Sequence, residues 1–258
     1  MRFASWNIAG GHLFRKSVED ALSYEEENLD YFISELEKIV ADILVLQESH
    51  TPIDTTQLSQ ASIIAKKLGY KLAGNHPYQE NSHIKKGNQL SLAVLSKHPV
   101  INSSFHRVPN PNLKITRENG DQWKTYDVGF LNCALDYHGT KINVSNGHMV
   151  PFHYFHRDFL EPTFQPIRDS IVQLFISLSQ QPTIVGADFN FNNLKSLLPP
   201  IFEKGLYKEA FIGIETTPGK GQQDHLLASH QWVIKTSDVK KKSSTDHFMC
   251  VMDVELNL

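Results

Sequence analysis

Short apolar runs recur along the whole chain, separated by polar turns and a few amphipathic stretches. The runs predict strands at residues 2–8, 43–46, 70–73, 90–96, 100–105, 128–136, 141–145, 183–186, 226–228, 232–235 and 248–256. The stretches 25–40, 58–68 and 167–178 carry apolar residues at helical spacing and predict helices, and Gly69 is placed to end the second. Strands buried on two sides, few long helices and no strict alternation of the two predict an α/β fold, with two packed sheets and helices outside.

The segments between these runs add to the prediction. His138-Gly139 predicts a turn that joins strands 128–136 and 141–145 into a hairpin. Residues 109–124 are polar and predict a long loop or a two-strand excursion, and residues 151–166 are irregular and rich in aromatic side chains. The sequence has no internal repeat, low-complexity tract or linker, which predicts a single domain over residues 1–258.

Composition limits the classes of partner. The net charge of −3 gives no global basic field, which weakens the case for tight, sequence-blind binding to long duplexes. A local basic rim stays open, with candidates at Lys85-Lys86, Lys240-Lys241-Lys242, Arg157 and Arg168. Cys133 and Cys250 lie in apolar runs, which favours core thiols over a disulfide. The sequence has neither a signal-peptide pattern nor an apolar stretch of about 20 residues, so we expect a cytoplasmic protein without a membrane span.

Polar residues end several of the apolar runs. Glu48 follows the run 43–46, where an ionised carboxylate is costly unless it is paired or bound to a cation. Asn7 ends the first strand, and its amide could coordinate a hard cation or hold a ligand. Taken alone, an exposed or paired carboxylate and a turn-forming asparagine explain these residues better.

Asp188 and Asn190 follow the buried run 183–186, two positions apart. At strand spacing both side chains point to the same side. A carboxylate that activates water beside an amide that holds a phosphoryl oxygen suits phosphoryl hydrolysis. An Asx turn explains the same pair.

Histidines lie near two further strand ends. Asp246 and His247 are adjacent and would face opposite ways on a strand, so His247 needs another orienting carboxylate, and Asp224 is a candidate. His148 ends Asn146-Gly147-His148, where an imidazole could contact a phosphoryl oxygen. A strand boundary and an Asn-Gly turn remain the simpler explanations of each site alone.

Together, the strings have a recognisable order. They read SWN, LQE, NGH, GADFN, QQDHLL and TDHF, from residue 5 to about residue 255. This order resembles the endonuclease/exonuclease/phosphatase family, which has the DNase I-like fold. The resemblance implies a four-layer α/β sandwich of two mixed sheets face to face, with helices outside and a cleft at one sheet edge. It also implies phosphoester hydrolysis with one or two Mg²⁺ or Mn²⁺ ions. Gly129-Phe130 is a departure, because members often carry Gly-Arg there.

The resemblance also implies roles, position by position. It places three residues at the metal, namely Asn7, Glu48 and Asp246. It places five residues in catalysis, namely His148, Asp188, Asn190, Asp224 and His247. Asp188 resembles the residue that activates water, and Asp224 the carboxylate that orients His247. Substrate contacts are expected from Asn7, Asn190, His148 and Arg157.

The family spans several substrate classes, so the fold alone does not identify the substrate. The opening and closing strings are similar to the tyrosyl-DNA phosphodiesterase branch. Aromatic and basic residues at 152–157 directly follow His148 and suit base stacking, a lipid headgroup or simple loop packing. We expect a phosphodiesterase or nuclease acting on nucleic acid ends or single strands. The alternatives are an enzyme acting on a small phosphorylated molecule or lipid headgroup, and an inactive binding module. The sequence does not predict the oligomeric state.

Overall fold

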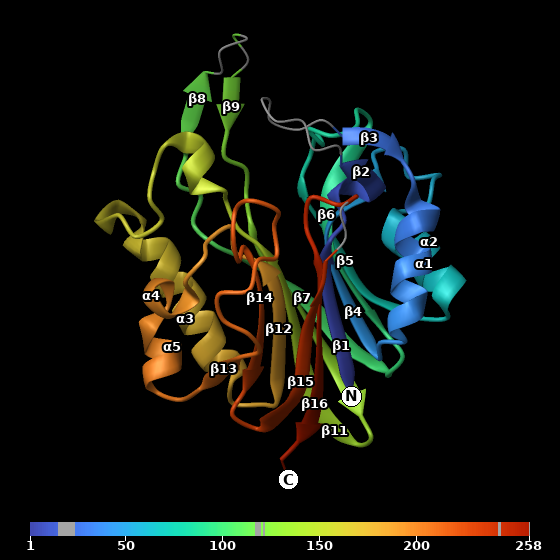
Figure 1. Ribbon diagram of the computed structural model, residues 1–258, viewed down its shortest axis with the longest axis vertical. Coiled ribbons are helices and arrows are strands. Elements are labelled where there is room, and N and C mark those ends of the chain that lie inside the picture. Colours follow the sequence, from blue (N-terminus) through green and yellow to red (C-terminus); the bar gives the residue numbers. More distant parts are fainter. Residues whose placement is uncertain (15–23, 117–119, 121, 242–243, 258) are drawn as a thin grey trace.

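The computed structural model describes residues 1–14, 24–116, 120, 122–241 and 244–257. Two six-stranded mixed sheets lie face to face, with helices on both outer sides (Figure 1). The first sheet has the order β15 (Trp232–Lys240), β16 (Met249–Leu256), β1 (Arg2–Asn7), β4 (Ile43–Pro52), β6 (Asn88–Ser96) and β5 (Lys71–Gln79). The second has the order β13 (Tyr207–Glu209), β14 (Asp224–Ser229), β12 (Thr183–Asp188), β11 (Thr140–His148), β10 (Gly129–Tyr137) and β7 (Val100–Arg107). The predicted α/β sandwich is confirmed.

The helices cover the outer faces of the two sheets. On the first sheet lie α1 (Leu29–Ile39) and α2 (Gln60–Leu68), and on the second lie α3 (Gln165–Leu178), α4 (Leu194–Leu197) and α5 (Pro199–Glu203) (Figure 1). The short strands are β2 (His12–Phe14), β3 (Tyr24–Glu27), β8 (Lys114–Thr116) and β9 (Gln122–Lys124). The 3-10 turns are η1 (Ala9–Gly11), η2 (Phe152–Phe155) and η3 (Pro162–Phe164). No helix in the described part of the chain is long and apolar enough to cross a membrane.

Three apolar layers hold the sandwich together. The layer between the sheets includes Phe3, Val45 and Val144. The layer under α1 and α2 includes Trp6 and Phe32, whose ring centroids lie 4.8 Å apart. The layer under α3 includes Phe130, Phe175 and Phe189. Each such side chain, when fully buried, contributes roughly 1.5–3 kcal/mol of transfer free energy.

Strand alternation decides which residues of β12 reach the other sheet. Ile184 packs in the layer between the sheets, whereas Val185 and Ala187 pack in the layer under α3. Gly186 and Asp188 share the face of Ile184, because residues two apart on a strand point the same way. The last carboxylate of the strand is therefore directed towards the first sheet.

Each sheet contains one parallel pair at its centre. In the first sheet β1 runs parallel to β4, with Asn7 opposite Gln47. In the second, β11 runs parallel to β12, with His148 opposite Asp188. Parallel strands bring their carboxyl ends to one edge, so the strand-end motifs collect at the same end of the sandwich.

Several predicted boundaries differ from the structure. Residues 24–27 form β3, and α1 begins only at Leu29, after Asn28 caps the backbone N–H of Tyr31. The predicted strands 43–46 and 70–73 continue to Pro52 and Gln79, beyond irregularities that interrupt their apolar pattern. The predicted helix end at Gly69 and the hairpin at 128–145 are confirmed. Among the described residues of the segment 109–124, β8 pairs with β9, as expected of the two-strand excursion.

Both cysteines are free and buried, as expected of core thiols. Burial raises the pKa of the Cys133 thiol to about 12. The thiol therefore remains protonated at neutral pH.

Candidate active site

Two irregularities in the first sheet bring side chains into the cleft. The register of β4 against β6 shifts between Leu46 and Ser49, and Glu48 in that gap has a φ of 53°. The register of β5 against β6 shifts between Pro77 and Gln79, and Tyr78 lies in that gap. A β-bulge redirects the side chain of its extra residue. Glu48 and Tyr78 both line the cavity described below.

The second sheet contributes a row of side chains across three strands. His148 on β11 pairs with Asp188 on β12, and Asp188 pairs with Asp224 on β14. Residues paired across neighbouring strands share one face of the sheet. Register alone therefore places one imidazole and two carboxylates side by side.

Asp188 lies at the centre of this group and is 1% exposed. Its Oδ2 accepts from Asn7 Nδ2 at 3.1 Å, and its Oδ1 accepts from the backbone N–H of Asn190 at 2.9 Å. The Nε2 atoms of His148 and His247 lie 3.6 and 3.7 Å from Oδ2. These contacts fix the carboxylate and leave it surrounded by groups that can donate.

His247 is held by the carboxylate predicted for it. Its Nδ1 lies 2.8 Å from Asp224 Oδ2 and 3.2 Å from Thr217 Oγ1, and its backbone carbonyl accepts from Trp6 Nε1 at 2.9 Å. Burial lowers the pKa of His247, but the negative charges of Asp224 and Asp188 and the hydrogen bond to Asp224 outweigh this and raise it well above its usual value. The cationic form is therefore favoured, with Nε2 near Asp188.

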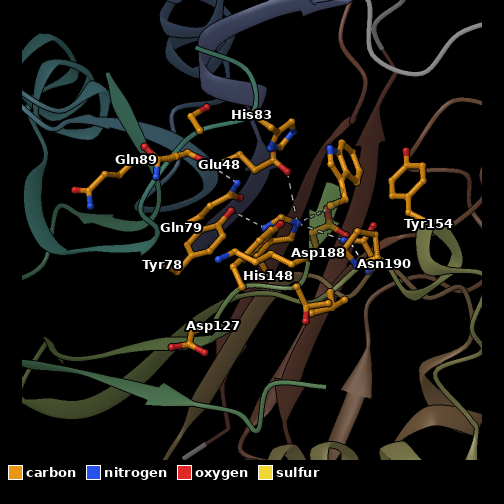
Figure 2. A pocket seen from close by; sticks show the side chains of 18 of the residues that line it. Glu48, Tyr78, Gln79, His83, Gln89, Asp127, His148, Tyr154, Asp188 and Asn190 are labelled. Carbon is orange, nitrogen blue, oxygen red and sulfur yellow. Dashed lines mark hydrogen bonds and ion pairs between the residues drawn. The ribbon is translucent and has the colours of Figure 1, made fainter. Parts of the chain in front are cut away.

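His148 is contacted from three sides (Figure 2). Tyr78 Oη lies 2.6 Å from its Nδ1, and Glu48 Oε1 lies 3.5 Å from its Nε2. Asn190 Nδ2 lies 3.3 Å from Nε2 and donates to the Met149 carbonyl at 3.0 Å. Burial and the Glu48 charge raise the pKa of the Tyr78 phenol well above its usual value, so it keeps its proton.

Asn190 reaches this position by a turn and not by strand spacing. Its φ is 50°, and its backbone N–H donates to Asp188, as in an Asx turn. The Asx turn given for this pair from the sequence is therefore confirmed, and the strand spacing is not. The turn itself carries the Asn190 amide to His148.

Three carboxylates suit a hard divalent cation. Glu48, Asp188 and Asp246 line one cavity, and Glu48 and Asp188 approach the same nitrogen of His148. Burial is the largest cause that raises the pKa of Asp246 to about 6, with the charge of His247 opposing it and that of Glu48 adding to it. A cation would relieve this crowding of negative charge, and Mg²⁺ prefers oxygen ligands. The donor set therefore fits the ion that the family resemblance implies.

Other arrangements of these residues fit a cation less well. Ligand atoms of Asp188, Asp224 and His247 lie within 4.8 Å of one another. However, Asp224 and His247 are hydrogen-bonded together, and an ion between them would have to displace that bond. Asn7 does not line the cavity, and its Oδ1 accepts from the backbone N–H of Ala9 at 3.1 Å. The expected substrate contact of Asn7 is therefore not supported. Asn7 Oδ1 keeps a second lone pair, with which it could bind a metal.

The cavity above these residues has a volume of about 1160 Å³. It extends from the candidate catalytic cluster, formed by Glu48, His148, Asp188 and His247, to the β8–β9 hairpin. The Trp123 ring centroid lies 5.9 Å from that of Tyr154 and 6.1 Å from that of His83. Lys220 lies over the Tyr154 ring, with Nζ 4.8 Å from its centroid. One wall of the cavity is thus aromatic and carries a cation.

None of the described candidates for a basic rim lines the cavity. Arg157 does not line the cavity, because its guanidinium is paired with Glu161, and the structure gives no support for its expected substrate contact. Arg168 is buried and donates to backbone carbonyls, and Lys85 pairs with Glu27 at 2.5 Å. Lys240 pairs with Asp238, and Lys242 lies outside the described residues. The basic residues that do line the cavity are Arg107, Lys124 and Lys220.

Sequence reasoning missed several residues of the site. Tyr78 lies beyond the predicted end of its strand, and the one signal was Pro77, which marks an edge or a bulge inside a strand. Thr217 and Lys220 lie in a turn-rich loop without periodicity. Trp123 lies in the segment predicted as a loop or a two-strand excursion, and nothing in the sequence predicted that its side chain lines the cavity.

The matches to known proteins agree with this architecture. A model of the Endonuclease/Exonuclease/phosphatase family matches residues 4–247. No curated protein sequence matches the chain. An endonuclease/exonuclease/phosphatase from Beutenbergia cavernae has a similar structure, with a TM-score of 0.70 at 15% identity over 99% of this chain and 71% of that chain. The human Nocturnin catalytic domain with bound sulfate anion also has a similar structure, with a TM-score of 0.67 at 18% identity over 99% of this chain and 93% of that chain.

A third similar structure is the mannosyl-6-phosphatase from Bacteroides thetaiotaomicron, with a TM-score of 0.60 at 13% identity over 99% of this chain and 100% of that chain. At these identities the likeness concerns the fold. The family model covers nearly the whole chain and includes every strand-end string described above except the final Phe248. The chain therefore belongs to the endonuclease/exonuclease/phosphatase family.

Proposed function

We propose that this protein is a divalent-metal-dependent phosphodiesterase that acts on nucleic acid ends or single strands. The observation that carries the proposal is one cavity with the catalytic cluster at its floor and the aromatic wall of Trp123 and Tyr154 beside it. Aromatic side chains stack on bases without regard to sequence, at roughly 1–3 kcal/mol per base. A protein without a global basic field can hold a short single strand in this way, while a long duplex would need more cations.

In this mechanism the chain's own residues position the phosphoester. His148 and the Asn190 amide donate to phosphoryl oxygens, and Asp188 orients the attacking water and accepts its proton. His247, held as a cation by Asp224, stabilises the developing charge or donates a proton to the leaving oxygen. A bound Mg²⁺ or Mn²⁺ at Glu48 and Asp246 would supply Lewis-acid neutralisation of the phosphoryl charge.

A second candidate is hydrolysis of a small phosphorylated molecule. Carboxamide side chains line much of the cavity, namely Gln79, Asn81, Gln89, Asn110, Asn112 and Gln122. Carboxamides both donate and accept, which suits the hydroxyl groups of a sugar. An inactive binding module is the least supported of the three, because the predicted acidic and imidazole groups lie within contact distance of one another.

The test is a panel of substrates with the wild type and Asp188→Asn. The panel holds a fluorescent single strand, a duplex, a 5′-tyrosyl oligonucleotide, sugar phosphates and phosphoinositides, each with and without Mg²⁺. We expect turnover of single strands or ends, and about a 100-fold or greater loss of kcat in Asp188→Asn. Turnover of sugar phosphates or phosphoinositides alone would favour the second candidate. Unchanged activity in Asp188→Asn would exclude the assigned mechanism.

A further inference from the structure

Tyr78 contacts the site but lies outside every strand-end motif. Its ring is 8% exposed, and the bulge in β5 directs it at His148 (Figure 2). The two rings meet edge to face, with centroids 5.4 Å apart at 78°. The distance of 2.6 Å from Tyr78 Oη to His148 Nδ1 is short for a hydrogen bond between neutral groups.

The direction of this hydrogen bond follows from the burial of the phenol. Tyr78 Oη makes one side-chain hydrogen bond in the described part of the chain, and its partner is His148 Nδ1. The phenol is buried, and a buried donor without an acceptor is costly, so His148 Nδ1 accepts the phenolic proton. A neutral imidazole that accepts at Nδ1 carries its own proton on Nε2.

The surroundings of Nε2 agree with a proton there. Two carboxylate oxygens lie nearby, Glu48 Oε1 at 3.5 Å and Asp188 Oδ2 at 3.6 Å. An ionised carboxylate can accept hydrogen bonds but cannot donate them. Among the described residues, the donor beside Nε2 is Asn190 Nδ2 at 3.3 Å, and it makes its shorter bond to the Met149 carbonyl at 3.0 Å. Acceptors therefore dominate around Nε2.

We propose that Tyr78 is a positioning residue that donates to His148 Nδ1 and holds the imidazole in its Nε2–H tautomer, with that N–H available to a phosphoryl oxygen. The tautomer follows from the contacts alone, whereas its use on a phosphoryl oxygen rests on the proposed function. A carboxylate in this place would orient the ring equally well, but it would add a further negative charge beside Glu48 and Asp188. A phenol orients His148 and leaves the charge of the site unchanged.

The direct test is the protonation pattern of His148. Long-range ¹H–¹⁵N spectra of the histidine-labelled full chain with Mg²⁺ added, assigned with His148→Gln, distinguish the two tautomers. We expect a protonated Nε2 and an unprotonated Nδ1 in the wild type. In Tyr78→Phe we expect both nitrogens to shift towards the average of exchanging tautomers. A wild-type His148 protonated at Nδ1, or at both nitrogens, would overturn the proposal, and this spectrum decides even if Tyr78→Phe does not fold.

Kinetics provide the second readout. On the best substrate of the panel, Tyr78→Phe should lower kcat by about 10- to 100-fold, with little change in KM. The matched control is Tyr207→Phe, which removes another buried hydroxyl, bonded to the Phe175 carbonyl at 3.0 Å, and should leave the His148 spectrum and kcat unchanged. A Tyr78→Phe protein with the wild-type tautomer and kcat would refute the role. If no substrate is turned over, the proposed function fails, while the spectra still decide the tautomer.

Discussion

Gly186 lies at a close approach of the two sheets, two residues before Asp188. A Cβ at this position would lie 2.8 Å from Val45 Cγ2 and 2.9 Å from both Phe3 and Ser5. These neighbours are buried and belong to the opposite sheet, so they have little room to move. A glycine is needed here because the sheets pack too closely for any side chain.

Gly186→Ala should therefore destabilise the fold and disturb Asp188. We expect a loss of about 1–3 kcal/mol in the free energy of unfolding, because extra methyl groups force packed cores apart. Urea denaturation of the wild type and the variant measures it. We also expect a lower kcat, because the added methyl group moves β12 and the carboxylate at its end. A variant within about 0.5 kcal/mol of the wild type would show that the sheets separate easily here.

At the level of single residues, the sequence predicted strand ends well and bulges poorly. Asp188, His148 and Asp224 could be anticipated, because each lies at the end or the start of a recognisable apolar run and parallel strands align such ends. Tyr78 could not be anticipated, because a bulge breaks the alternation from which strands are read. Arg157 does not line the cavity, because proximity in the sequence to His148 does not say which way a side chain points.

The β8–β9 hairpin is the element that shapes the cavity away from the catalytic cluster. It carries Trp123 opposite Ile115 and projects from the second sheet, at the end of the sandwich opposite the two chain termini (Figure 1). The sequence of this segment is polar and gave two alternatives, of which the two-strand excursion is correct. Its contribution to the cavity depends on tertiary contacts with Tyr154 and His83, which local sequence does not encode.

Trp123→Ala tests what this hairpin does. We expect kcat/KM for a single-stranded oligonucleotide to fall by about 5- to 150-fold, the range that corresponds to loss of one base-stacking contact. Hydrolysis of bis(4-nitrophenyl) phosphate, which has no base, should change little. The matched control is Lys114→Ala on the same hairpin, which is exposed and does not line the cavity. An equal loss on both substrates would mean that the hairpin supports the fold of the site and not the binding of a base.

At the scale of the whole molecule, an ion pair joins β1 and β16, which come from opposite ends of the chain. Arg2 on β1 lies opposite Asp253 on β16, with Nε 2.8 Å from Oδ1. The hydrogen bond from Arg2 is the largest cause that lowers the pKa of Asp253. A lowered carboxylate pKa stabilises the fold above the unfolded value of about 3.9, and this contribution is lost as the pH falls through the folded value.

Arg2→Met should therefore destabilise the protein in a manner that depends on pH. At pH 7 we expect a loss of only about 0.2–1 kcal/mol, because the two side chains are 45% and 31% exposed and solvent screens the pair. The difference from the wild type should shrink as the pH is lowered towards 3, and also in about 1 M NaCl. Urea denaturation at each pH measures it, with Asp253→Asn completing a double-mutant cycle. A difference independent of pH would assign the loss to packing of the Arg2 stem.

The cation site joins parts of the molecule that are distant in the sequence. Glu48 comes from the first sheet, Asp188 from the second, and Asp246 from the segment before β16. An ion bound by Glu48 and Asp246, beside Asp188, stabilises the folded state only, so the melting temperature should rise with Mg²⁺ concentration. The corresponding gain in the free energy of unfolding is about 2.7 kcal/mol at roughly 100-fold above Kd. Calorimetry with and without EDTA measures this independently of activity. Glu48→Gln should lose most of the Mg²⁺ effect, whereas Glu203→Gln, an exposed carboxylate on α5, should keep it. An equal rise in both variants would mean that the ion binds elsewhere, because Glu48 lines the cavity and Glu203 does not.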